Sequence, residues 1–492
     1  MENNKNVDMA SEKMYDAFDL MKYASKIRQL VDLKDTRDSG TASYSSFTKD
    51  DILTYLRSPA NQNNEKRLRK ASIQMFTGNM QYWRLVMHYA MMPAWIYSIV
   101  PRPFNTDGPA VNKEAVNKQL IKVSEHVSKM SIEHEMRKAM QTVFTEGVLY
   151  GVVWQNADTW YIQKIDADYC KLSSIADGTY LFAVDMSKIK DTDLMFYPEE
   201  FRTMYNAYQS TGVKWQEVPE RITFCLKANE HLSYNVPPFA AALPAIYDLE
   251  AYKDLARVAT ELNNYKLVAM EVPTDNEGKL TLGWDRIMEF YTHLANALPP
   301  EVGAAAVPMK LNAIDFERSG VARDTDETES ATRHFWYTSG TSPLLFGDAA
   351  NTSSSALSLS IKAGEGIVLS IVKQCERVLN RHMKYISGNP KFKLVIHPVT
   401  SYNYEAWVKY LKDAGTLGLP VKLAYNSISG VEPGVVSSMT FVENDVLKLV
   451  DKFKPLTSSY MQSGETGRPE ATDDEIGDAG EQTRETGGNE NK

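Results

Sequence analysis

The sequence predicts an α+β fold made of several structural units, with one long helix as its largest element. Three observations lead to this prediction. The length of 492 residues indicates about two to four units. With 43% hydrophobic and 24% charged residues, the chain has the composition of a globular protein with enough apolar residues for a core. Short strand-like and longer helix-like segments follow one another, and the longest helical pattern begins after residue 353.

The long helix is predicted between Ser355 and Gly388, with a kink. Its apolar residues recur at steps of three and four, which is the spacing of one helical face. They are Leu357, Ile361, Val368, Val372, Cys375, Leu379, Met383 and Ile386. Most charges fall off this stripe, and the serine run before it can cap the first free N–H groups. Gly364 and Gly366 each cost about 1 kcal/mol against alanine in a helix, so we expect the kink there.

Composition and charge exclude several functional classes. A net charge of -9 argues against tight general nucleic-acid binding. Residues 462–492 contain nine acidic and three basic residues and so carry much of this negative charge. We expect them to be a disordered acidic tail. The three cysteines show no metal spacing and fit a reducing compartment. The N-terminus lacks the apolar stretch of a signal peptide, and no apolar run is long enough for a bilayer, so we expect no membrane association.

The first half of the chain reads as an arm followed by an α+β region. Residues 1–49 are a polar arm or peripheral helix, although its last residues start a helix that ends before Ser58-Pro59. Residues 50–239 form the α+β region. Its elements are predicted as helices before and after Gly78-Asn79, a helix over 131–145, strands at 147–154, 159–166, 169–172 and 178–184, a helix over 198–212 and a strand over 221–226. The aromatic and methionine residues near Trp83 are most simply core packing.

The second half is predicted to place a compact βαβ unit between two helices. The successive segments are a helix over 240–265, the βαβ unit within 266–321, a helix within 322–339, a loop over 340–354, the long helix and a strand over 355–400, and a helical region over 401–461.

This order of elements resembles the portal proteins of tailed bacteriophages. The block from Leu68 to Tyr97, with its Asn-centred turn, looks like their N-terminal region, and the helix and strands from residue 131 to 184 are similar to their wing domain. The resemblance implies a portal-protein fold. In it, 50–239 and 355–400 are wing, 240–265 and 322–339 are stem helices, 266–321 is the clip, 340–354 is the tunnel loop and 401–461 is the crown.

The resemblance also implies a function, partners and a location. A portal protein forms a ring, usually of twelve subunits, at one capsid vertex, where terminase packages double-stranded DNA that is later ejected. Expected partners are the terminase large subunit, the major capsid and scaffold proteins and a head-completion (adaptor) protein, with no cofactor and no enzymatic activity. The expected location is the virion, with assembly in the host cytoplasm.

Two groups of residues are the candidate sites. The implied channel residues of the tunnel loop are Leu344, Leu345, Phe346, Asp348, Asn351 and Thr352. Three basic residues of the long helix, Lys362, Lys373 and Arg377, are candidate contacts to DNA or to neighbouring subunits. The alternative for these three is an ordinary solvated helix face.

Catalytic motifs were sought as the main alternative. No phosphate-binding Gly-x-x-x-x-Gly-Lys-Ser/Thr occurs. His134 starts half of a zinc-protease motif whose second histidine is absent, and Ser370 to Lys373 matches Ser-x-x-Lys in mid-helix without its partner motifs. The acidic run 324–329 lacks the glycine that an EF-hand loop needs. Another structural head protein, such as a scaffold or minor capsid component, or a phage enzyme fused to a structural domain, stays open as an alternative.

Overall fold

The computed structural model describes residues 47–103, 113–156, 159–264, 266–271, 281–297, 302–307, 327–346, 354–387, 391–432 and 434–449. The contacts divide the chain into a unit Met1–Gly434, which holds the core, and a unit Val435–Lys492. In the second unit, α14 (Val436–Phe441) continues into a π-helical turn, Val442–Val446. The predicted arm up to residue 46 and the acidic tail lie outside the described residues.

Three helices begin the first unit, and local capping signals set their ends. They are α2 (Lys49–Arg57), α3 (Gln62–Gly78) and α4 (Met80–Ala90). Thr48 and Asp51 form a capping box at the start of α2. Asn79 ends α3, and its side chain accepts from the Tyr82 N–H at the start of α4. Tyr82, Leu85 and Tyr89 on α4 are buried, which confirms core packing for these residues, whereas Met80 and Trp83 are exposed, contrary to the prediction.

Two antiparallel sheets follow, and five of their six strands were predicted, β6 (Trp215–Glu217) being the one that was not. The strands are β2 (Val148–Gln155), β3 (Trp160–Lys164) and β7 (Thr223–Lys227) in one sheet, and β4 (Cys170–Ala176), β5 (Thr179–Asp185) and β6 (Trp215–Glu217) in the other. Helix α6 (Ile132–Glu146) leads into β2 through Gly147, whose φ is +82°. A Cβ at Gly147 would lie 2.5 Å from the Val236 carbonyl carbon, so only glycine fits this turn. Helix α7 (Glu199–Thr211) packs against β6.

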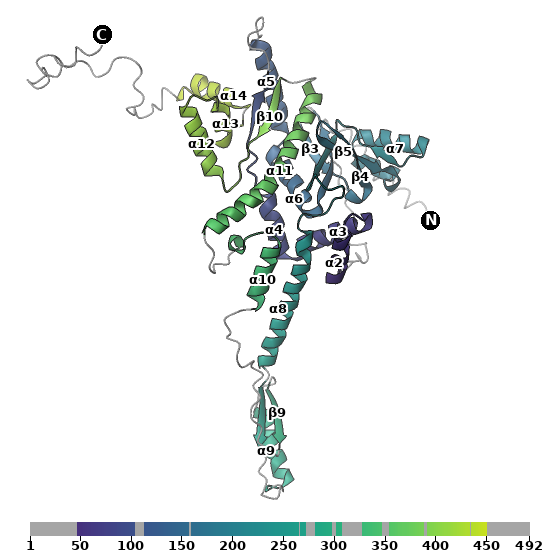
Figure 1. Cartoon of the computed structure of the whole chain (residues 1–492), viewed down its shortest axis with the longest axis vertical. Coiled ribbons are helices and arrows are strands. Elements are labelled where there is room, and N and C mark those ends of the chain that lie inside the picture. Colours follow the sequence, from purple (N-terminus) through teal and green to yellow (C-terminus); the bar gives the residue numbers. More distant parts are fainter. Residues whose placement is uncertain are drawn as a thin grey trace, which may run out of the picture. The chain divides into compact units, whose positions relative to one another are not determined.

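The predicted βαβ unit is present between two paired helices. Its elements are β8 (Lys266–Glu271), α9 (Trp284–Ala297) and β9 (Val302–Val307), and β8 and β9 pair in parallel. Helix α8 (Leu243–Asn264) precedes the unit, and α10 (Glu327–Thr338) follows it. Helices α8 and α10 pack side by side, as Figure 1 shows.

The long helix is α11 (Ser354–Ser387), and its stripe faces the main core. Val368, Val372, Cys375, Leu379 and Met383 are all buried. Helical hydrogen bonding continues through Gly364 and Gly366, and the ribbon of α11 changes direction part-way along its length (Figure 1). A kink at the two glycines stays a prediction.

Strand β10 (Phe392–Ile396) pairs with a strand that the sequence analysis missed, β1 (Tyr97–Pro101). Along the other edge of β10, side chains of α11 take the place of a neighbouring strand. Asn380 both donates to the carbonyl of Leu394 (2.8 Å) and accepts from its N–H (2.9 Å), and Glu376 accepts from the Ile396 N–H (2.8 Å). The backbone groups on this edge are therefore hydrogen-bonded without a further strand.

The remaining helices are α5 (Lys113–Lys129), which was not predicted, and α12 (Tyr404–Thr416) and α13 (Lys422–Ile428), which were. Helices α12 and α13 form a hairpin over a small core of Val399, Leu411 and Ile428. Short 3-10 turns lie at Ala167–Tyr169, Met186–Lys188, Asp191–Phe196, Ala240–Ala242 and Pro343–Phe346.

Candidate functional site

The segment between α10 and α11 begins with residues held tightly against the core. Gly340 has a φ of +73°, which turns the chain out of α10. The Thr341 N–H donates to the Trp336 carbonyl (3.1 Å), and the Ser342 N–H donates to Ser360 Oγ on α11 (3.3 Å). We call residues 341–346 the loop anchor, because these bonds attach them to both flanking helices.

The last residue of the loop anchor, Phe346, packs between aromatic rings. Its ring stacks on Trp336, with centroids 3.9 Å apart and an interplanar angle of 12°. The His88 ring packs edge-on against Phe346, with 5.7 Å between ring centroids. Burial lowers the pKa of His88, so the neutral imidazole is favoured in this packing. Phe346 is thus a packing residue of the main core.

The predicted channel residues fall into two groups. Leu344, Leu345 and Phe346 lie on the loop anchor, where all three are half-buried. Asp348, Asn351 and Thr352 lie outside the described residues. Contact between this loop and DNA stays a prediction.

The three candidate basic residues of α11 have different surroundings. Lys373 pairs with Glu376 (2.8 Å), and Arg377 pairs with Glu230 (2.6 Å). Lys362 is exposed, and no ion pair to it exists within the described part of the chain. Because two of the three charges are matched inside the chain, Lys362 is the best placed of them to bind an outside group.

Sequence reasoning missed the residues that hold the loop anchor. His88 and Trp336 contact Phe346, and Tyr402 lies against His88, with 5.9 Å between ring centroids. The only local signal was the aromatic run Phe335-Trp336-Tyr337 at the end of α10, directly before the loop.

Two elements carry apolar side chains that no other part of the described chain covers. Every residue from 250 to 255 on α8 is exposed, including Tyr252 and Leu255, three residues apart on one face. On α9, Trp284 is 64% exposed, and Met288 follows four residues later on the same side. Exposed apolar patches of this kind mark protein–protein contacts.

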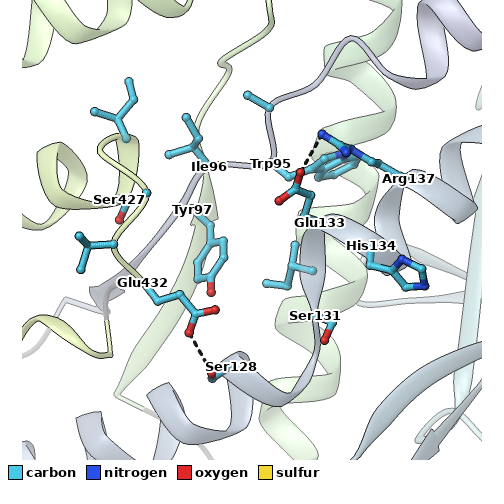
Figure 2. Close-up of a pocket in the computed structure, with 15 residues that line it drawn as sticks. Trp95, Ile96, Tyr97, Ser128, Ser131, Glu133, His134, Arg137, Ser427 and Glu432 are labelled. Atoms are coloured by element: carbon cyan, nitrogen blue, oxygen red, sulfur yellow. Dashed lines mark hydrogen bonds and ion pairs between the residues drawn. The ribbon is translucent and has the colours of Figure 1, made fainter. Parts of the chain in front are cut away.

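A cavity of about 540 Å³ lies between the approach to β1, the corner between α5 and α6, and the chain after α13 (Figure 2). Arg137 pairs with Glu133 (2.7 Å), and Glu432 accepts from the Ser128 hydroxyl (2.8 Å). The two carboxylates that line the cavity are therefore both bonded to neighbouring side chains.

Other chemistry was also sought among the described residues. There, no three His, Cys, Asp or Glu side chains are grouped to hold a metal ion. All three cysteines are buried, and burial raises the pKa of Cys225 to about 12, so this thiol stays protonated at neutral pH. In the ranges given above, no helix combines the length and hydropathy that crossing a bilayer needs.

Comparisons with known proteins found similarity only at the level of structure. No family model matches the chain, and no curated protein matches its sequence. A chain from the virion of a native gene transfer agent (GTA) particle is similar at a TM-score of 0.40 and 13% identity, over 75% of this chain and 99% of that one. A chain from the neck of an empty GTA particle, computed with C6 symmetry, also has a TM-score of 0.40 at 13% identity, over 73% and 94%. A chain from the neck of a native GTA particle, computed with C12 symmetry, is similar at a TM-score of 0.36 and 13% identity. This match covers 72% of this chain and 94% of that one.

Proposed function

We propose that this protein is a portal protein, a non-enzymatic ring subunit through which terminase packages double-stranded DNA and through which the DNA later leaves. One observation carries the proposal. Paired helices α8 and α10 precede and follow a parallel βαβ unit in the chain, and the loop anchor comes after α10 and before α11. This is the succession of stem, clip, stem, tunnel loop and wing helix that portal proteins have.

The uncovered surfaces support an assembly of many copies. Parallel sheets are normally buried on both faces. Within the described residues, β8 and β9 form a two-stranded parallel sheet with α9 as its one helix, and residues 250–255 of α8 are exposed, so both leave surface for further protein to cover. Neighbouring copies in a ring would supply that cover to every subunit equally.

The proposed mechanism is steric and electrostatic. DNA must slide through a channel, whereas firm phosphate binding would release counterions and hold the duplex in place. An acidic chain in which Lys373 and Arg377 are both matched by acidic side chains suits sliding. The loop anchor would keep the base of the tunnel loop fixed while residues beyond Phe346 meet the DNA.

The partners and location follow from this role. The βαβ unit, with Trp284 and Met288 exposed, is the proposed docking surface for the terminase large subunit and later for the adaptor protein. Major capsid and scaffold proteins would contact the wing, and the ring would sit at one vertex of the virion after assembly in the host cytoplasm.

The deciding experiment measures the mass of the purified chain by mass photometry and images the same sample by electron microscopy. For 55.5 kDa subunits, about twelve copies in a closed ring give roughly 670 kDa. A closed ring with a central hole supports the proposal. A compact monomer that cleaves DNA in the presence of magnesium would overturn it in favour of the enzyme alternative.

A further inference from the structure

The loop anchor contacts α4 through two neighbouring residues of that helix. The Tyr89 hydroxyl lies 3.1 Å from Thr341 Oγ1, where either group can donate. The His88 ring packs edge-on against Phe346. Tyr89 is held in place by Phe239, with 5.0 Å between ring centroids. Helix α4 is therefore a rigid support for the loop anchor.

The turn that begins α12 contacts the same part of α4 from its other side. Tyr402 packs on His88, and its hydroxyl lies 3.5 Å from His88 Nδ1. The Ser401 N–H donates to the Met92 carbonyl just after α4 (3.0 Å). His88 is therefore shared, because its ring touches Phe346 of the loop anchor and Tyr402 at the base of the α12–α13 hairpin.

Helix α11 makes a second connection through two consecutive residues. A Cβ on Gly364 would lie 3.1 Å from Tyr89 Cε1, so α11 and the Tyr89 ring are in direct contact. The next residue, Glu365, accepts a hydrogen bond from the Thr400 hydroxyl in the turn before α12. Both residues belong to the part of α11 where the two glycines predicted the kink.

We infer that α4 and the Gly364–Glu365 step of α11 couple the loop anchor mechanically to the α12–α13 hairpin. A displacement of Phe346 or Thr341 changes the packing of His88 and Tyr89. His88 contacts Tyr402, and Tyr89 contacts Gly364, whose neighbour Glu365 binds Thr400. The coupling concerns one chain and holds whether or not the chain forms a ring. Within the proposed function, it would carry the state of the tunnel loop to the crown.

Hydrogen–deuterium exchange of the purified full chain tests this coupling. Tyr402 is 45% exposed, so Tyr402→Ala removes its ring from His88 without opening the core. Coupling between two sites is reciprocal. Tyr402→Ala is therefore expected to raise amide exchange in residues 341–346 about fivefold. Phe346→Ala is expected to raise exchange in residues 399–407.

Tyr404→Ala is the matched control. Tyr404 is 41% exposed and starts the same helix, but its hydroxyl donates to the Ile428 carbonyl on α13. This variant should raise exchange in α13 and leave residues 341–346 unchanged. Strands β2 and β3 serve as the internal reference for global unfolding.

The outcomes are distinct. Raised exchange in 341–346 with Tyr402→Ala, and not with Tyr404→Ala, supports the coupling. Exchange that rises only near residue 402 overturns it, even if the mass measurement finds a ring. If Phe346→Ala also raises exchange in β2 and β3, that variant is unfolding, and Tyr402→Ala alone decides.

Discussion

At the residue scale, Arg381 shows a charge whose role the helical pattern did not reveal. Arg381 is a charged residue of α11, whose charges are expected mostly off the apolar stripe, but it is 1% exposed. Its guanidinium donates to Thr179 Oγ1 on β5 and to the Thr223 carbonyl on β7. Arg381 thus joins α11 to both three-stranded sheets, and burial lowers its pKa.

Replacing Arg381 should destabilise the fold strongly. Arg381→Ala leaves a cavity and removes a charged donor from two buried acceptors, so the free energy of unfolding is expected to fall by about 3 kcal/mol. Arg381→Met keeps most of the packing and should cost less. Urea denaturation of the three proteins checks this, and equal stability of Arg381→Ala and wild type would show that the bonds contribute nothing.

His382, the next residue, should make stability depend on pH. Its Nε2 donates to the Thr223 carbonyl (3.0 Å), and burial together with the nearby Arg381 charge lowers its pKa to about 3. The unfolded chain takes up this proton near the ordinary value of about 6.5, whereas the folded chain does not. The free energy of unfolding should therefore fall as pH drops below about 6.5, by up to about 1.4 kcal/mol per pH unit for this group.

Urea titrations of wild type and His382→Gln near pH 6.5 and pH 5 measure this effect. His382→Gln should be less stable than wild type at both pH values. Its free energy of unfolding should fall less between pH 6.5 and pH 5, because the unfolded variant has no imidazole at position 382 to protonate. An identical loss in both proteins would contradict the assignment. The comparison is needed because burial also lowers the pKa of His126, His88 and His397.

At the element scale, α11 combines a core stripe, the edge of β10 and a change of direction in one helix. The two glycines in it have opposite surroundings. Gly364 faces the Tyr89 ring, which other aromatic side chains and Thr341 hold in place. Gly366 has open space where a Cβ would stand. One glycine is required by packing, and the other is not.

These two positions give a matched pair of substitutions. Gly364→Ala forces its Cβ against a ring that cannot move freely, so it should lower the melting temperature. Gly366→Ala meets nothing and gains helix propensity, so it should stabilise the chain by up to about 1 kcal/mol. Thermal melts of both variants check the signs. If both substitutions stabilise the chain, the Tyr89 ring moves aside for the new Cβ at position 364 at little cost.

At the scale of the whole molecule, the exposed apolar residues predict assembly. Leu255 on α8 is 60% exposed, and a neighbouring copy should cover it in the proposed ring. Leu255→Lys would bury a charge in that contact, so we expect the ring to be lost while the melting temperature of the monomer is unchanged.

Val213→Lys is the control for this prediction. Val213 follows α7 and is 56% exposed, so the same change of chemistry is made on a different part of the surface. Mass photometry should find rings for Val213→Lys and dissociated subunits for Leu255→Lys. If both variants form rings of equal mass, the exposed face of α8 is not part of the contact between subunits.

The sequence by itself determined the elements whose signals lie within one or two turns. The helix start at Thr48, the two helices separated by Gly78-Asn79, the βαβ unit between two helices and the stripe of α11 were all predicted from the local pattern of residues. Their order carried the resemblance to portal proteins, and with it the loop between α10 and α11 as the candidate site.

Only the tertiary structure decided which distant residues meet. Tyr97 pairs with Ile396, Arg381 becomes a core residue, and Phe346 packs on Trp336 and His88. A local sequence pattern does not identify these distant contacts. A short strand or a single aromatic residue has the same sequence whether it is exposed or packed against another segment. The position of Phe346 at the base of the loop follows from packing between segments that are far apart in the chain.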